Sequence, residues 1–199
     1  LGFAPRHCVI APHRKTLRHD EERQLDYAIR GRRAIVCGSS QGLGYACALA
    51  LAQEGVEIVL NGRTAPKLAQ AADALREATG VPVTPVCVDI TTEQGRTALL
   101  AACPEPDILI NNNAGPPPGQ LEDWTQDVWL QALQSNMLAA IALIQQVVRG
   151  MQARRFGRIV NITSAMVKSP RPHMALSTTA RAGLTAYCKA LSLEVALPE

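Results

Sequence analysis

Apolar residues follow two alternating patterns along most of this 199-residue chain. From residue 29 onward, short uninterrupted apolar runs are separated by longer segments in which apolar residues recur every three or four positions. The first pattern is typical of buried strands, and the second is typical of helices with one buried face. Their regular succession predicts βαβ units, and therefore a parallel sheet covered by helices on both faces.

The apolar runs and the segments between them define the expected elements. Strands are predicted at 33–37, 56–60, 83–88, 107–110 and 158–162. Helices are predicted at 43–54, 64–80, 91–102, 123–151 and 175–197. Thr64, a capping box at 91–94 and Asp123 are the expected starts of the second, third and fourth helices. The pattern therefore predicts an α/β protein with a doubly wound parallel sheet in three αβα layers.

Residues 1–28 lack this alternation and are interpreted as an irregular, poorly ordered leader before a single domain at 29–199. The leader carries His7, Cys8, His13 and His19, whose spacing imposes no ligand geometry, so no metal site is predicted.

Composition excludes several classes of partner. The chain is 47% hydrophobic with a formal net charge of +3, which is too small to indicate nucleic acid or a membrane surface. The longest stretch without charge, 128–148, contains Gln131, Gln134 and Asn136, so we do not expect it to span a membrane. The six cysteines show neither paired nor metal-ligand spacing and are interpreted as buried thiols in a reducing compartment. We therefore expect a cytoplasmic protein without nucleic-acid or membrane partners.

A glycine-rich segment marks the expected ligand site. It reads Gly38-Ser39-Ser40-Gln41-Gly42-Leu43-Gly44 and lies between the first strand and the first helix. Glycines at such a turn let backbone N–H groups approach a pyrophosphate at the positive end of a helix. All seven residues are therefore predicted to form a dinucleotide-binding turn.

Four further motifs resemble those of the short-chain dehydrogenase/reductase family in order and spacing. They are Asp89-Ile90 after the third strand, Asn112-Asn113-Ala114-Gly115 after the fourth, Asn136 in the long helix, and 157–164, which ends in Ser164. The resemblance covers 29–199 and is closest to bacterial 3-oxoacyl-acyl-carrier-protein reductases. It implies a Rossmann-type fold and an oxidoreductase acting on a carbonyl/alcohol pair, with 3-oxoacyl thioesters as one candidate substrate.

The resemblance also implies roles for the matched residues. Asp89, Ile90, Asn113, Ala114 and Gly115 would contact the cofactor, whereas Asn136 and Ser164 would belong to the catalytic group. Family members continue into a sixth strand and a substrate-covering region. The domain at 29–199 is therefore expected to be incomplete at its C-terminal end, with its fifth strand at the edge of the sheet.

Arg63 indicates which dinucleotide the site prefers. The second strand is followed by Asn61-Gly62-Arg63, which has no acid to bond the ribose 2′-hydroxyl of NAD. An arginine at this position can pair with a 2′-phosphate, so NADPH is predicted to be preferred over NADH.

The chain departs from the family at its catalytic pair. Ser177 stands where the family has tyrosine, and Arg181 stands where it has lysine. A serine hydroxyl is a far weaker acid than a phenol, and arginine keeps the positive charge but does not exchange protons near neutral pH. His173 is an alternative acid, whereas Tyr187 lies roughly 15 Å farther along the last helix. Ser164, Ser177, Arg181 and Asn136 are therefore the predicted catalytic residues.

Two functions remain open at this point. The first is an NADP(H)-dependent oxidoreductase acting on a small carbonyl or alcohol. The alternative is a catalytically weak or inactive NADP(H)-binding module that serves as a sensor or partner subunit. In either case, we expect a homo-oligomer formed through the long apolar helices.

Overall fold

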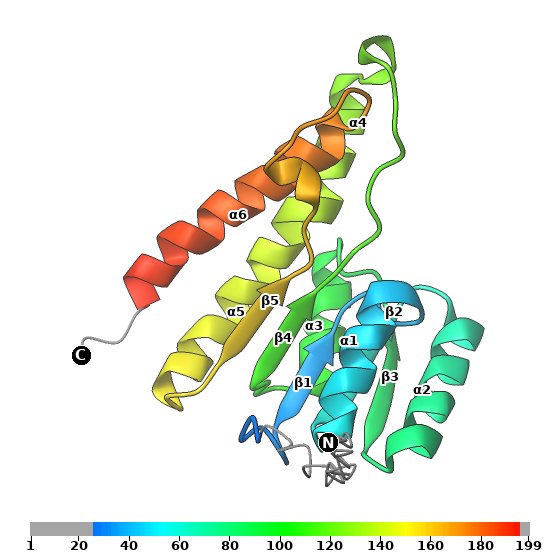
Figure 1. Cartoon of the computed structure of the whole chain (residues 1–199), viewed down its shortest axis with the longest axis vertical. Coiled ribbons are helices and arrows are strands. Elements are labelled where there is room, and N and C mark those ends of the chain that lie inside the picture. Colours follow the sequence, from blue (N-terminus) through cyan, green and yellow to red (C-terminus); the bar gives the residue numbers. More distant parts are fainter. Residues whose placement is uncertain (1–25, 196–199) are drawn as a thin grey trace, which may run out of the picture.

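The computed structural model describes residues 26–195 and contains one sheet of five parallel strands (Figure 1). They are β1 (Arg33–Val36), β2 (Glu57–Gly62), β3 (Val83–Cys87), β4 (Ile108–Asn111) and β5 (Arg158–Asn161). The order across the sheet is β3-β2-β1-β4-β5, so the direction of winding reverses between β1 and β4. Val36 pairs with Leu60 of β2 and with Ile110 of β4, which aligns the carboxyl ends of these strands. Open α/β sheets bind ligands at such a reversal.

Helices cover both faces of the sheet and enclose two apolar cores (Figure 1). One core contains side chains of α1 (Gly42–Gln53) and α2 (Ala65–Thr79), and the other contains side chains of α3 (Glu93–Ala102), α5 (Ala139–Ala153) and α6 (Ala175–Val195). Alternate residues of β1 enter opposite cores, as in Val36 and Ile35. The predicted three-layer, doubly wound α/β fold is therefore confirmed.

The predicted start of the fourth helix was wrong. Asp123 lies in a 3-10 turn, Leu121–Asp123, where its carboxylate accepts a hydrogen bond from the backbone N–H of Gln120 at 2.7 Å. That local bond occupies the side chain before it can cap a helix. The helix begins after Thr125, whose hydroxyl accepts from the backbone N–H of Val128 at 3.5 Å.

The segment predicted as one long helix at 123–151 is divided in the structure into three helical elements. They are α4 (Gln126–Leu133), a π-helical turn at Gln134–Leu138, and α5. By length and composition alone, Gln126–Ala153 could cross a membrane. One side of α5 is buried in the second core, with Leu143 and Ile144 fully enclosed, so packing against the sheet explains its apolar composition.

The start of α3 differs from the predicted capping box. Thr92 is the cap, and its hydroxyl accepts from the backbone N–H of Gly95 at 3.0 Å. Glycine at this third helical position supplies no side chain to bond back, so the reciprocal half of a capping box is missing. The hydroxyl of the neighbouring Thr91 donates to Asp89 instead, at 2.8 Å.

The cysteine interpretation holds for only part of the set. Cys37 and Cys103 are buried, Cys47 and Cys188 are half-buried, and Cys87 is exposed, which contradicts the expected burial at that position. Burial raises the pKa of the Cys37 thiol to about 12, which keeps it protonated and unreactive. The leader residues His7, Cys8, His13 and His19 lie outside the described residues.

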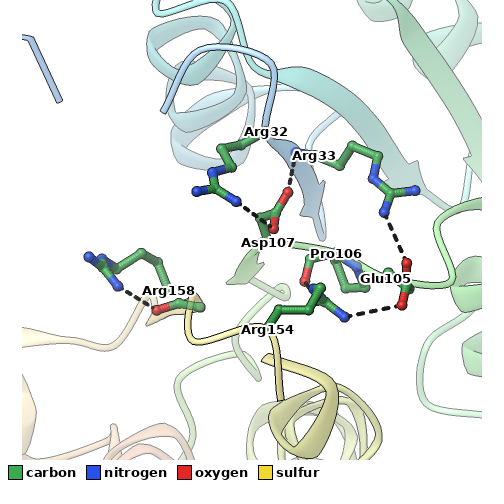
Figure 2. A network of polar contacts seen from close by, with 8 residues as sticks. Arg32, Arg33, Glu105, Pro106, Asp107, Arg154 and Arg158 are labelled. Atoms are coloured by element: carbon green, nitrogen blue, oxygen red, sulfur yellow. Dashed lines mark hydrogen bonds and ion pairs between the residues drawn. The ribbon is translucent and has the colours of Figure 1, made fainter. Parts of the chain in front are cut away.

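Polar contacts link the beginnings of β1 and β4 to the end of α5 (Figure 2). The Asp107 carboxylate accepts from the backbone N–H of Arg33 at 3.0 Å and from the Arg32 side chain at 3.4 Å. Glu105 lies between Arg33 and Arg154, at 3.6 and 3.5 Å. Because Asp107 is buried and bonded to backbone, it contributes more to the rigidity of this region than the exposed pairs do.

Candidate nucleotide-binding and active site

The turn between β1 and α1 requires glycine for two physical reasons. Gly38 and Gly42 have φ values of +55° and +62°, which L side chains rarely adopt. A Cβ on Gly38 would lie 2.8 Å from the carbonyl oxygen of Asn112, and a Cβ on Gly44 would overlap the carbonyl oxygen of Gly38. The Asn112 side-chain amide donates to that same oxygen at 2.9 Å, which fixes the turn to the end of β4. The result is a rigid backbone cradle of the kind that binds a pyrophosphate.

A cleft of about 330 Å³ opens beside this turn at the carboxyl end of the sheet. The predicted cofactor residues that line it are Gly38, Ser40, Gln41, Gly42, Arg63, Asp89, Ile90, Asn113 and Ala114. Residues that the motifs had not assigned to the cofactor also line it, namely Asn61, Gly62, Thr64, Lys67, Val88 and Asn112. The signal for Lys67 was its position four residues after Arg63, which places both cations at the start of α2.

The other predicted cofactor residues, Ser39, Leu43, Gly44 and Gly115, are not part of this lining. Ser39 is fully buried, and its hydroxyl donates to the carbonyl of Val36 at 2.7 Å and accepts from the N–H of Asn61 at 3.0 Å. Ser39 therefore braces β1 against β2 from behind the cleft. Leu43 is 67% exposed, Gly44 packs under the turn, and Gly115 belongs to the neighbouring group described below.

Asp89 carries a carboxylate with a fixed orientation. Its Oδ1 accepts from the backbone N–H of Thr91 at 2.9 Å and from the Thr91 hydroxyl at 2.8 Å. The backbone bond is the main cause of the lowered pKa of Asp89; partial burial opposes it, whereas the Thr91 hydroxyl and the charge of Arg63 reinforce it. The carboxylate therefore stays ionised at the floor of the cleft.

Replacing Asp89 with Asn is expected to lower thermal stability at pH 7 but not in acid. Because the folded-state pKa lies below the unfolded value of about 3.9, the carboxylate stabilises the fold above that value and loses its contribution as pH falls through the folded pKa. Melting temperatures of both proteins between pH 7 and pH 3 would test this. Asp73→Asn, which removes an exposed carboxylate beside Arg76, is the control. A wild-type advantage that stays constant with pH would contradict the assignment.

A second group of polar side chains gathers around Gly115. A Cβ on this glycine would lie 3.4 Å from Nη2 of Arg181 and 3.8 Å from Oγ of Ser177, so the three residues meet at one point. Ser177 is only 7% exposed in the first turns of α6. Ser164 follows β5, where its hydroxyl accepts from the backbone N–H of Met166 at 3.2 Å and caps a short 3-10 turn, Ala165–Val167.

Arg181 joins this group to the rest of the fold. Its Nη1 donates to the carbonyls of Thr163 at 2.6 Å and Ile162 at 3.4 Å, at the end of β5. Its Nη2 donates to Oδ1 of Asn136 at 3.3 Å, within the π-helical turn. Burial lowers the pKa of Arg181, but arginine remains a cation at neutral pH. The predicted catalytic residues Arg181 and Asn136 are therefore in direct contact.

The alternative acid His173 differs in burial from Tyr187, which its position along the helix had excluded. His173 is exposed, with φ of +64°, and its carbonyl accepts from the backbone N–H of Gly119 at 3.0 Å. Tyr187 packs against the core formed by α5 and α6, and burial is the main cause of its raised pKa. Tyr187 therefore remains a neutral phenol inside the helical layer.

Comparison with known proteins is consistent with this geometry. Residues 32–198 match the family model for short chain dehydrogenases. The chain is 32% identical over 172 residues to gluconate 5-dehydrogenase of Gluconobacter oxydans, covering 84% of this chain and 67% of that protein. It is 28% identical over 172 residues to the 3-oxoacyl-[acyl-carrier-protein] reductase of Pseudomonas aeruginosa, covering 84% and 69%.

Solved structures share the fold of this chain. L-sorbose reductase from Gluconobacter frateurii, complexed with NADPH and L-sorbose, superposes with a TM-score of 0.81 and 32% identity, covering 86% of this chain and 66% of that one. A xylitol dehydrogenase bound to NAD+ superposes with a TM-score of 0.75 and 28% identity, covering 84% and 68%. The chain spans between about half and two thirds of the length of curated relatives such as these.

Proposed function

The chain belongs to the short-chain dehydrogenase/reductase family, and from this premise we propose that it is an NADP(H)-dependent oxidoreductase acting on a carbonyl/alcohol pair. The observation that carries the proposal is the cleft at the winding reversal, where a glycine cradle faces the side chains of Arg63 and Lys67. The cofactor supplies the hydride chemistry when bound. The chain's own residues supply binding, orientation and charge.

The residues of the cleft fit NADP(H). The cradle at Gly38 and Gly42 leaves room for phosphate oxygens where a Cβ would intrude. The carboxyl end of β2 offers no carboxylate for a ribose 2′-hydroxyl, and the Nδ2 group of Asn61 already donates to the carbonyls of Val86 and Val88, at 3.2 and 3.0 Å. Arg63 and Lys67 are the cations that line the cleft beyond it, and both suit a 2′-phosphate.

The proposed catalytic roles combine the group around Gly115 with Ser164, which follows β5. Ser164 can donate a hydrogen bond to a substrate carbonyl oxygen, and the charge of Arg181 favours negative charge developing nearby. Asn136 accepts a hydrogen bond from Nη2 of Arg181 and so orients that charge. Ser177, or a water that it binds, supplies the one proton that the substrate oxygen takes up when hydride adds to the carbonyl carbon. Because serine is a weak acid, this step is expected to be slow.

The absence of a phenol at position 177 favours the alternative function. In this alternative, the chain is an NADP(H)-binding module with weak or no turnover that acts as a sensor or partner subunit. Ser177 is buried and lies beside Arg181, so the site keeps its charge but has no phenol at the reacting position. Cofactor binding without turnover would favour this function over the enzyme.

Self-association is proposed for either function. Leu130 and Leu138, on the continuous α4–α5 helix, are 55% and 43% exposed despite being large and apolar. Covering them in a homo-oligomer would remove apolar area from water. A cytoplasmic location accords with this proposal and with the reduced cysteines.

An activity assay tests the proposal and separates the two functions. Purified protein with NADPH would be mixed with a panel of ketoses, polyol-derived ketones and 3-oxoacyl thioesters, and cofactor oxidation followed by absorbance. Turnover of any panel member supports the enzyme. If NADPH binds but every substrate fails, the sensor or partner role is favoured.

Replacing Arg63 with Ala is expected to weaken NADPH binding by roughly ten- to a hundredfold and to leave NADH binding nearly unchanged. A charge-assisted hydrogen bond to phosphate contributes about 1.5–3 kcal/mol, and NADH lacks that phosphate. Arg76→Ala, in the helix that follows Arg63, removes an arginine that pairs with Asp73 and does not line the cleft, and is the matched control. An equal loss of affinity for both cofactors would rule out 2′-phosphate recognition by Arg63.

A further inference from the structure

Two buried polar atoms behind the active-site group have no hydrogen-bond partner within residues 26–195. They are Nε of Arg181 and Oδ1 of Asn111, the last residue of β4. Both residues line one small cavity of about 20 Å³ between the sheet, the π-helical turn and α6. The other lining residues are Ile90, Asn112, Asn113, Ser135, Asn136, Ala140, Ile162 and Leu184. The residues that carry this donor and this acceptor therefore line the same small cavity.

The cavity matches a single water molecule in size and chemistry. A site must offer roughly 10–15 Å³ and two to four polar partners to hold a water, and this cavity meets both requirements. The guanidinium Nε–H can only donate, and an amide oxygen can only accept. A water can accept from the first and donate to the second, so it satisfies two groups that would otherwise be buried without partners.

We propose that this cavity binds one ordered water, which accepts a hydrogen bond from Nε of Arg181 and donates one to Oδ1 of Asn111. Arg181 is then held through every nitrogen of its guanidinium: Nη1 by the Thr163 carbonyl, Nη2 by Asn136, and Nε by the water. Asn111 is fixed in turn, because its Nδ2 donates to Oδ1 of Asn161 at 2.9 Å. Asn161 donates to Sγ of Cys188 at 3.2 Å. Asn111 is thus a positioning residue that acts on Arg181 through the water.

This water is specific to arginine at position 181. A lysine side chain has a methylene group where arginine has Nε, so it offers no donor at that point to face the cavity. This chain has arginine where the family has lysine, and the proposed water with Asn111 supplies the hydrogen-bond partner that the additional Nε–H group needs. The consequence for function, which rests on the proposed NADP(H) site, is that Asn111 stabilises the nicotinamide end of that site and not the adenine end.

A crystal structure of the protein at about 1.5 Å resolution tests the water directly. We expect one density peak within about 2.7–3.2 Å of both atoms. A dry cavity, or Asn111 bonded directly to Arg181, would overturn the proposal. This result is independent of whether the protein binds NADP(H).

Filling the cavity with a larger side chain provides a second test, in which the direction of the change in melting temperature distinguishes a dry cavity from a hydrated one. Ala140→Val adds two methyl groups at the cavity wall. If the space were a dry void, filling it would raise the melting temperature. If it holds the proposed water, the valine displaces it, leaves both polar atoms without partners, and lowers the melting temperature by several degrees. Ala142→Val, in the same helix but outside the lining, controls for placing a β-branched residue there.

Ligand binding separates positioning from general damage. Asn111→Ala and Ala140→Val are each expected to weaken NADPH binding by about tenfold. Neither should change the affinity for adenosine 2′,5′-bisphosphate, which occupies only the end of the cleft at Arg63 and Asp89. Equal loss for both ligands, or no loss for either, would overturn the positioning role. If the unaltered protein bound neither ligand, the proposed function would fail, and the crystallographic test of the water would still stand.

Discussion

The double replacement Ser177→Tyr and Arg181→Lys is expected to raise the rate of carbonyl reduction by roughly 10²–10⁴-fold, the usual contribution of a positioned general acid. A phenol at position 177 would project toward Gly115, where the Ser177 hydroxyl already lies. A lysine at 181 would keep the positive charge that lowers the pKa of the neighbouring phenol. The rate of NADPH oxidation with an accepted substrate is the quantity to measure.

The single variants distinguish a restored acid from a general change in the site. Ser177→Tyr alone should give part of the gain, because Arg181 still supplies a positive charge. Arg181→Lys alone should give none and should destabilise the protein slightly, since Asn136 and the Thr163 carbonyl lose their present donors. If the double variant binds NADPH normally and remains as slow as the unaltered protein, the missing phenol does not limit turnover.

Replacing Gly38 with Ala is expected to abolish measurable NADPH binding and to destabilise the protein. An alanine at position 38 would have to keep φ near +55°, which L residues rarely adopt. Its Cβ would lie 2.8 Å from the carbonyl oxygen and 2.9 Å from Nδ2 of Asn112, so the turn would be forced away from β4. The backbone strain costs about 1–2 kcal/mol and the overpacking a further 1–3 kcal/mol. Calorimetric titration with NADPH and thermal unfolding measure the two effects.

Gly80 supplies the matched control for this prediction. It ends α2 with φ of +72°, but a Cβ there would have no neighbour within 4 Å. Gly80→Ala should therefore show the strain alone, about 1 kcal/mol or roughly 2–4 °C in melting temperature, with NADPH binding intact. If Gly38→Ala behaved like Gly80→Ala, the close packing of the turn against Asn112 would not be essential.

The strands and the glycine turn were predictable because each depends on short-range sequence patterns. β1 is a continuous apolar run that enters both cores, so its residues report burial directly. The turn at Gly38 and Gly42 requires positive φ, and few residues other than glycine tolerate that conformation. Such features can be inferred from neighbouring residues alone.

The remaining features depend on contacts between distant segments. Asp123 has the composition of a helix cap, but its bond to Gln120 places the cap at Thr125. Ser39 belongs to the glycine motif, yet its side chain turns toward β2 and away from the cleft. These outcomes are set by geometry within the folded chain, and the spacing of residue types does not encode them.

The active-site group shows the same limit more clearly. The sequence identified Arg181 as a replacement for lysine, but nothing in the motif indicated that it would bond the carbonyl of Thr163 and the side chain of Asn136 together. Asn111, one residue before the Asn-Asn-Ala-Gly motif, had no functional signal at all. Its proposed role follows from a buried oxygen without a partner among residues 26–195, which only the assembled fold reveals.

A titration of the unaltered protein with NADPH and NADH, followed by nucleotide fluorescence, tests the central claim most directly. The account predicts saturable binding of NADPH at least about tenfold tighter than that of NADH, because Arg63 and Lys67 face the 2′-phosphate. Equal affinities would contradict the NADP(H) preference, and the absence of binding to either nucleotide would contradict the proposed function of the cleft as a whole.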